Sequence, residues 1–253
     1  MRVTFLGTGT SQGVPVIACD CEVCQSNNPK DNRLRSSILI EWKETTLIVD
    51  TGPDFRQQLL RTTVQKLDAV LYTHEHKDHT AGLDDVRAFN YKFNRPMPLY
   101  AEQRVLDSLK NEFRYIFSDY PGVPKIELNK IHNKAFFIGN KKIIPIRVLH
   151  KNLPILGYRF DDFAYITDAS FIMDSELEKL KGVHTLVLNA VRIKEHHSHF
   201  NLESALKIFA KIRPEKSYIT HIGHQLGRHN TVSKKLPETI ELAYDGLVLD
   251  FNK

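Results

Sequence analysis

The sequence predicts an α/β fold, and three observations support this prediction. First, the chain has 253 residues, of which 42% are hydrophobic and 26% charged, enough to bury one sizeable core. Second, short apolar or alternating runs with strand character recur along the chain. Third, segments with helical periodicity alternate with the later runs, which is the order of an α/β protein with a strand-rich middle. Because no fixed-period repeat and no low-complexity linker divides the chain, we expect one domain over residues 1–253.

The apolar runs and the periodic segments locate the individual elements. Strands are expected over residues 2–6, 37–41, 46–49, 69–72, 142–149, 156–160, 163–166, 185–188, 216–219 and 247–250. Helices are expected over residues 54–62, 104–113, 174–180, 202–212 and 232–241. Residues 90–98 and 118–124 carry loop signals, and they could form an insertion beside a functional site.

Composition and charge limit the class of protein further. No stretch reaches the roughly 18 apolar residues that a membrane span needs, so no membrane partner is expected. The first residues indicate a strand that enters a glycine turn rather than a secretory signal, and the three cysteines lie too close together for a disulfide framework. A cytoplasmic protein is therefore expected. The formal net charge of +5 would suit an anionic substrate, but charge alone carries little weight.

The densest chemical signal is a His-x-His-x-Asp-His motif formed by His74, His76, Asp78 and His79. It follows the apolar run 69–72, where a buried strand is expected to emerge into a loop. Imidazole and carboxylate groups are the usual ligands of zinc, manganese and iron, and such a loop can direct neighbouring side chains at one point. A solvated polar loop is the alternative, but it leaves the ligand-type residues at these positions unexplained. The motif therefore predicts a metal site.

The motif after an apolar strand resembles the signature of the metallo-β-lactamase-fold hydrolases. The resemblance implies a four-layer αββα sandwich, in which one more His, a bridging Asp and a final His follow later strands. The sequence supplies these residues in that order, as His150, Asp168 and His221. Each of them alone would be more typical of a turn or a helix cap. Together with the first motif they indicate one ligand set.

Position by position, the resemblance implies two divalent metal ions. The first would be held by His74, His76 and His150, and the second by Asp78, His79 and His221, with Asp168 bridging both. Two such cations lower the pKa of a shared water, so metal-bound hydroxide can cleave a phosphodiester near neutral pH. Zinc and manganese both suit these ligands, and iron is a further option. Asp50 also follows a strand and could orient a ligand histidine, although a plain turn aspartate fits the sequence equally well.

A second metal-type cluster consists of Cys19, Cys21 and Cys24, three soft ligands that are one short of a tetrahedral zinc site. The resemblance to the cysteine-cluster branch of this fold pairs them with His224 in Thr-His-Ile-Gly-His, so we expect one structural zinc. A redox or nucleophilic cysteine is the weaker alternative, because no thioredoxin-like Cys-x-x-Cys context surrounds the cluster.

Three features together resemble the phosphoribosyl 1,2-cyclic phosphate phosphodiesterases of the carbon-phosphorus lyase pathway: the glycine turn in 6–11, the cysteine cluster, and residues 220–225. In that subfamily a histidine before a helix is thought to protonate the departing oxygen, and His199 matches it best. His199 and the ligand Asp78 are therefore the candidate catalytic residues. A solvated loop is the alternative for the segment that holds His199. The remaining histidines receive no role in catalysis, and they are His132, His184, His196, His197 and His229.

These observations predict hydrolysis of a small phosphodiester, cyclic or nucleotide-like, as the function. One alternative is an RNA-processing nuclease, because tRNA 3′-processing endonucleases resemble this chain in the histidine motifs. Their long glycine- and proline-rich arm is not seen, so nucleic acid is not the favoured partner. A cofactor-biosynthesis enzyme that resembles the pyrroloquinoline quinone pathway protein is a second alternative, and an inactive metal-holding interaction protein would not need the full ligand set. β-Lactam hydrolysis is disfavoured because Asp168 stands where such enzymes typically have Cys. A homodimer is compatible with the sequence.

Overall fold

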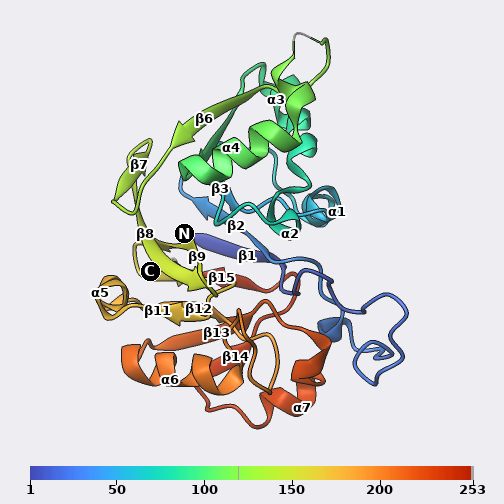
Figure 1. Cartoon of the computed structure of the whole chain (residues 1–253), viewed down its shortest axis with the longest axis vertical. Helices are drawn as coiled ribbons and strands as arrows, with labels where there is room; N and C mark the ends of the chain where they lie inside the picture. Colours follow the sequence, from blue (N-terminus) through green and yellow to red (C-terminus); the bar gives the residue numbers. More distant parts are fainter. Residues whose placement is uncertain (119, 252–253) are drawn as a thin grey trace. The chain divides into compact units, whose positions relative to one another are not determined.

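The computed structural model describes residues 1–118 and 120–251, and its two compact units each contain a mixed β-sheet (Figure 1). The first unit comprises residues 1–7, 37–132 and 246–251, and the second comprises residues 8–36 and 133–245. Helices pack against both sheets, so the predicted α/β class is confirmed.

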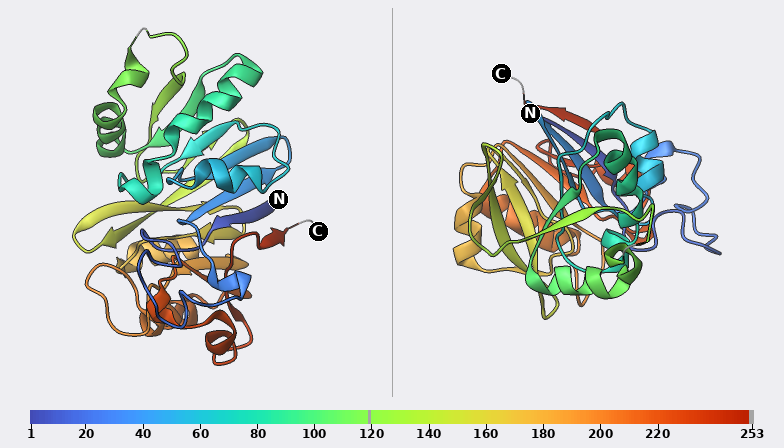
Figure 2. Two further views of the ribbon diagram at one scale, coloured as in Figure 1. Left: turned by 90° about the vertical axis from the view of Figure 1, so that its right-hand side faces the viewer. Right: turned by 90° about the horizontal axis from the view of Figure 1, so that it is seen from above.

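The first unit is built on a seven-stranded sheet in the order β15-β1-β2-β3-β4-β5-β6. Its strands are β1 (Arg2–Gly7), β2 (Ser37–Trp42), β3 (Thr45–Val49), β4 (Ala69–Leu71), β5 (Met97–Ala101), β6 (Ile126–Lys130) and β15 (Val248–Asp250). The strands from β3 to β6 are parallel, whereas β15, β1, β2 and β3 pair in antiparallel fashion. The strands at the two ends of the chain, β1 and β15, therefore lie side by side (Figure 2).

The helices of the first unit bury apolar side chains in one core with this sheet. They are α1 (Phe55–Leu60), α2 (Lys77–Thr80), α3 (Arg87–Phe93) and α4 (Gln103–Glu112), with short 3-10 turns at Leu83–Val86 and Arg114–Phe117. Phe55 of α1 and Leu106 and Leu109 of α4 join Val70 and Leu99 of the sheet in that core. Burial of large apolar side chains of this kind contributes about 1.5–3 kcal/mol each.

The second unit is built on an eight-stranded sheet in which the order is β11-β8-β9-β10-β12-β13-β14, with β7 paired to β8. Its strands are β7 (Phe136–Ile138), β8 (Lys141–His150), β9 (Leu153–Phe160), β10 (Phe163–Tyr165), β11 (Phe171–Ile172), β12 (Thr185–Asn189), β13 (Lys216–Thr220) and β14 (Ile240–Leu242). The strands β10, β12, β13 and β14 are parallel, and β8 runs in the same direction because β9 is antiparallel to both β8 and β10.

The helices of the second unit are α5 (Asp174–Leu177), α6 (Leu202–Ile212) and α7 (His229–Ser233), with 3-10 turns at Pro29–Asp31, Glu178–Leu180 and His224–Leu226. The helix α6 lies along the sheet (Figure 1), where Ala205 and Phe209 pack with Leu188 and Ile219. The side chain of Asn201 accepts a hydrogen bond from the Ser204 backbone N–H, so Asn201 is the N-cap of α6.

Several predicted elements differ from the observed ones. The strands β5, β6, β7, β11 and β14 were not predicted, and α3 with β5 occupies most of the expected loop 90–98. The left-handed conformation of Asn94 (φ 47°) ends α3, and the prolines before and within β5 hide its strand pattern. The expected helix 232–241 is wrong, because α7 ends before Pro237 and Ile240–Leu242 pairs with β13. Of the expected loop 118–124, residue 119 lies outside the described residues, and the others are irregular.

Within the part of the chain that the structure describes, every helix is too short or too polar to cross a lipid bilayer.

Candidate metal centre

The predicted ligands lie at the ends of strands in both units. In the first unit, the His-x-His-x-Asp-His motif follows β4 and continues into α2. In the second unit, His150 is the last residue of β8, Asp168 follows β10, and His221 follows β13. Because these three strands run in the same direction, their carboxyl ends meet at one edge of the sheet.

In the first unit, a hydrogen-bond chain orients His74 and His79. The Thr73 hydroxyl donates to Asp50 Oδ2 (2.8 Å), so its oxygen is left to accept from His74 Nδ1 (2.9 Å). His79 Nδ1 lies 2.7 Å from Asp50 Oδ2 and donates to that carboxylate. Both rings therefore carry their proton on Nδ1 and present the Nε2 lone pair, the atom that a metal would take. The ring of His76 packs against His74, with 4.5 Å between ring centroids.

Asp50 organises the candidate ligands of the first unit. It is fully buried, and the Thr73 backbone N–H also donates to its Oδ1 (2.8 Å). Burial raises the pKa of the Asp50 carboxyl, and the His79 ring and Thr73 oppose that shift by favouring the charged form. The structure thus gives Asp50 the contacts of an orienting carboxylate, the reading that the sequence left open against a plain turn.

In the second unit, His150 and His221 are oriented in the same way. His150 Nδ1 lies 2.9 Å from the Asp168 carbonyl and 2.8 Å from the Ser198 carbonyl, and carbonyls only accept, so Nδ1 carries the proton. The Ser36 hydroxyl donates to the Gly9 carbonyl, and its oxygen then accepts from His221 Nδ1 (3.2 Å). Each ring again leaves Nε2 as the lone-pair donor.

The carboxylate of Asp168 stands between the histidines of the second unit. Its Oδ1 lies 3.2 Å from His221 Nε2 and 3.8 Å from His199 Nδ1, and its Oδ2 accepts from the Thr167 hydroxyl (2.6 Å). The donor atoms of His150, Asp168 and His199 all lie within 4.8 Å of one another. An anionic oxygen among imidazole nitrogens is a donor set that suits a divalent cation.

His199 occupies a distinct position in this group. Its side chain is only 13% exposed, and its Nδ1 is buried and has no hydrogen-bond partner among the described residues. Burial lowers the pKa of His199 to about 3, and the nearby Asp168 opposes that shift. A buried polar atom without a partner is rare in proteins and indicates a place where another group binds.

Three residues at these strand ends adopt the left-handed backbone conformation that L residues rarely occupy. They are Asp50 (φ 64°), Asp168 (φ 60°) and His221 (φ 52°). Such conformations cost of the order of 1–3 kcal/mol each and persist where surrounding contacts hold them. Their occurrence at three candidate site residues indicates that these strained backbone conformations are retained because they set the direction of the side chains.

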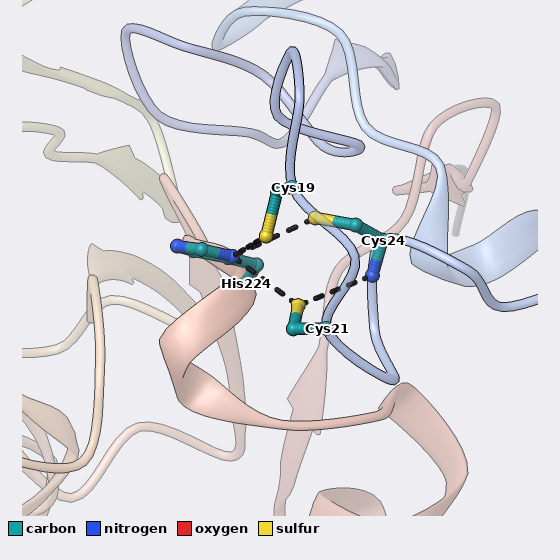
Figure 3. A group of neighbouring side chains, drawn as sticks. All are labelled: Cys19, Cys21, Cys24 and His224. Atoms are coloured by element: carbon teal, nitrogen blue, oxygen red, sulfur yellow. Dashed lines mark hydrogen bonds between the residues drawn. The ribbon is translucent and has the colours of Figure 1, made fainter.

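The cysteine cluster also forms a compact donor set, entirely within the second unit. Figure 3 shows the three cysteines of one loop facing His224. The distances from His224 Nδ1 to the sulfur atoms of Cys19, Cys21 and Cys24 are 3.3, 3.3 and 3.5 Å. A tetrahedron with Zn–S near 2.3 Å and Zn–N near 2.1 Å requires separations of about 3.6 Å, so the four side chains fit a zinc ion. The Cys24 backbone N–H lowers the pKa of the Cys21 thiol to about 6, which favours the thiolate that a metal binds.

The loop that carries the cysteines is tied to the C-terminal part of the second unit (Figure 2). The buried Arg33 guanidinium donates to the Thr8 hydroxyl (2.8 Å) and the Ala243 carbonyl (2.6 Å), and it contacts His229 Nδ1 (3.2 Å). His229 is therefore a packing residue in the second unit. Burial lowers its pKa to about 4.

The second unit contains a cavity of about 310 Å³ that is bordered by His199 and by His224. It is lined by Thr10, Ser11, Gln12, Val191, Arg192, His196, His197, Ser198, His199, Gly223, His224 and Gln225, none of them acidic. Arg192 donates to the carbonyls of Lys194 and Glu195 and to the Gln225 amide oxygen, all neutral acceptors, so its charge is available to an anion. His196, His197 and His199 thus line a cavity that also contains the Arg192 guanidinium.

Sequence reasoning missed the residues that orient the ligands from outside the motifs. Ser36 and Thr73 have this function, and so does Ser198 through its backbone carbonyl. The hydroxyl before the His-x-His motif was a usable signal, because a threonine beside a ligand histidine can accept from its ring.

Comparisons with known proteins identify the family of this chain. Residues 45–222 match the beta-lactamase superfamily domain. The chain belongs to this superfamily, whose members such as the PhnP and ribonuclease Z proteins are metal-dependent hydrolases.

Within that class, the chain is similar to a diphosphatase from the PhnP family. The two sequences are 41% identical, and the crystal structure of that protein superposes on this chain with a TM-score of 0.94. The match covers 99% of this chain and 98% of the other. Zinc-bound PqqB from Methylobacterium extorquens has a TM-score of 0.82 at 20% identity over 99% of this chain and all of the other, a likeness of fold.

Two curated relatives extend the comparison. An octanoyltransferase from Porphyromonas gingivalis is 40% identical over 98% of this chain and 51% of its own length. Ribonuclease Z from Staphylococcus epidermidis is 25% identical over 72% of this chain and 55% of its own length. The chain therefore spans about half the length of these curated relatives.

Proposed function

We propose that this chain hydrolyses a small phosphodiester, cyclic or nucleotide-like, with the help of two divalent metal ions. The observation that carries the proposal is that His74, His79, His150 and His221 each donate a hydrogen bond from Nδ1, so that each ring presents its Nε2 lone pair as a metal ligand. When bound, two divalent ions supply a hydroxide near neutral pH and balance the charge on phosphate oxygens. Under the same proposal, Cys19, Cys21, Cys24 and His224 hold a structural zinc.

The residues of the chain account for the remaining parts of such a reaction. Asp50 and Thr73 hold two ligand histidines in one tautomer, and the cavity that contains Arg192 supplies a cationic surface for an anionic substrate. His199 borders both Asp168 and this cavity, so it is placed to donate a proton to a departing alkoxide. A bound phosphate beside its ring would favour the charged form and raise the low pKa of His199, so the proton would be held when substrate is present.

A panel of substrates tests the proposal. We expect the purified, metal-loaded protein to hydrolyse bis(p-nitrophenyl) phosphate and a cyclic ribose phosphate in steady-state assays, and to lose this activity on treatment with a chelator. Octanoyl thioester, to which the name of one relative points, should not be turned over. Preferred turnover of the thioester, or activity that survives removal of all metal, would exclude the proposed function.

RNA cleavage is a second candidate, and one observation favours it. The first unit contains a cavity of about 730 Å³ whose described lining residues include Arg87, Arg95, Lys125, Tyr91 and Tyr120 and no acidic residue. Cationic and aromatic side chains together suit the phosphate and the base of a nucleotide. Adding precursor tRNA to the panel separates the two candidate functions. A nuclease should cleave precursor tRNA at a lower substrate concentration than it needs for the small diesters.

The general-acid position of His199 gives a further prediction. Replacing His199 with alanine should reduce turnover of a cyclic ribose phosphate by about 10²–10⁴-fold, because its alkoxide leaving group needs a proton. Turnover of bis(p-nitrophenyl) phosphate should fall much less, since p-nitrophenolate departs without one. His197 is exposed and lines the same cavity, so His197→Ala serves as the control. It should change the turnover of both substrates by the same factor. Equal losses on both substrates in His199→Ala, or loss of metal, would refute the acid role.

A further inference from the structure

The residues that alternate with the ligands in the His-x-His-x-Asp-His motif both contact one helix. Glu75 lies between His74 and His76 and forms an ion pair with Arg104, near the beginning of α4. Lys77 follows His76 and forms an ion pair with Glu112, the last residue of α4 (Nζ to Oε2, 2.6 Å). The backbone at His76 is extended (φ −60°, ψ 148°), so neighbouring side chains point in different directions. The motif is therefore attached to α4 through the residues that are not ligands.

The helix α4 can serve as a rigid support for this loop. Its buried residues Val105, Leu106 and Leu109 belong to the core of the first unit. Arg104 and Glu112 are eight residues apart, which is about 12 Å along a helix axis. Since Asp50 holds His79 from the sheet, the motif is held from two directions, by β3–β4 through Asp50 and by α4 through the pair of Glu75 with Arg104.

The two ion pairs differ in exposure, and this difference predicts which one matters. The two glutamates, Glu75 and Glu112, are both 22% exposed, but Arg104 is 36% exposed whereas Lys77 is 65% exposed. Exposed pairs contribute roughly 0–1 kcal/mol because solvent screens them, while partly buried pairs with a fixed geometry contribute more.

We propose that Glu75 and Arg104 are positioning residues that hold His74 and His76 in the geometry required for metal binding. Arg104 acts through Glu75 and does not touch the metal or the substrate. This inference rests on the proposed function in that it needs a metal at the motif, but it concerns only how α4 supports that site.

Arg104→Gln distinguishes positioning from simple electrostatics. Removing a positive charge near a cation site should tighten metal binding if Coulomb interaction alone operates. Positioning predicts the opposite sign, with metal affinity weaker by about 10-fold, at the lower end of the range typical of direct partners of a ligand, because Arg104 acts through Glu75. The affinity can be measured by competition of Co²⁺ with a chromophoric chelator, and the Co²⁺ d–d absorption band of the variant should change in shape and intensity.

Three matched variants complete the experiment. Arg104→Lys should recover most of the affinity, and in a Glu75→Gln background the Arg104→Gln change should have no further effect, because the partner is already gone. Lys77→Gln, which breaks the exposed pair on the same helix, should change the affinity less than about threefold. Tighter binding or an unchanged spectrum in Arg104→Gln would overturn the inference while leaving the proposed function intact. Failure of the unmodified protein to bind Co²⁺ beyond the cysteine cluster would overturn both.

Discussion

Replacing Asp168 with alanine should remove both metal and activity from the protein. Asp168 supplies the anionic oxygen among the histidines of the second unit, 3.2 Å from His221 Nε2, and without it only the imidazoles of His150 and His221 remain in that unit to bind a cation. We expect turnover of bis(p-nitrophenyl) phosphate to fall by more than about 10³-fold, beyond the 10–100-fold typical of residues that only support a ligand. Metal per chain, measured by plasma mass spectrometry after dialysis, should fall in parallel.

Backbone strain at this position requires a second variant and a matched control. Asp168 has a left-handed backbone (φ 60°), in which alanine is strained and can unfold the segment. Asparagine has nearly the same side-chain shape as aspartate and tolerates this conformation, so Asp168→Asn removes only the charge. Asp161 offers the control, since it is also left-handed (φ 49°) and in the same unit, but exposed in the turn between β9 and β10. Asp161→Asn should keep metal and activity. If Asp168→Asn also keeps both, the ligand role is wrong.

Replacing Cys21 with serine should destabilise the protein and release one zinc. Binding of a structural zinc is coupled to folding and provides several kcal/mol, because the unfolded chain has no preformed site. A loss of about 3 kcal/mol or more corresponds to a decrease in melting temperature of roughly 10 °C for a chain of this size. Differential scanning fluorimetry with a zinc assay measures both quantities.

A chelator and a neighbouring substitution separate this effect from a general loss of stability. Asp20 is exposed and lies between Cys19 and Cys21, so Asp20→Asn should leave the melting temperature unchanged. Chelator treatment should lower the melting temperature of the unmodified protein toward that of Cys21→Ser and should affect the variant less. An unchanged melting temperature in Cys21→Ser would show that the cluster does not bind a structural ion.

Local patterns in the sequence were sufficient for most of the fold. The apolar strands of the first half and the helix Leu202–Ile212 carry their periodicity and caps within a few residues. The missed strand Met97–Ala101 contains a proline, and the missed strand Ile240–Leu242 is short. Both are strands because of the neighbours they pair with, β4 and β6 for the first and β13 for the second, which are distant in the sequence.

The sequence by itself determined which side chains can act as ligands, because histidine, aspartate and cysteine are identifiable from chemistry and from their order after apolar runs. Only the tertiary structure decided how they are oriented. Which nitrogen of His74 or His221 carries the proton depends on Thr73 and Ser36, and whether Asp50 is a turn residue or an orienting carboxylate depends on His79. The left-handed backbone at Asp168 and the support of Glu75 by α4 likewise have no local signature. The physical reason is that hydrogen bonds and ion pairs depend on distance in space, and folding brings together groups that the sequence keeps apart.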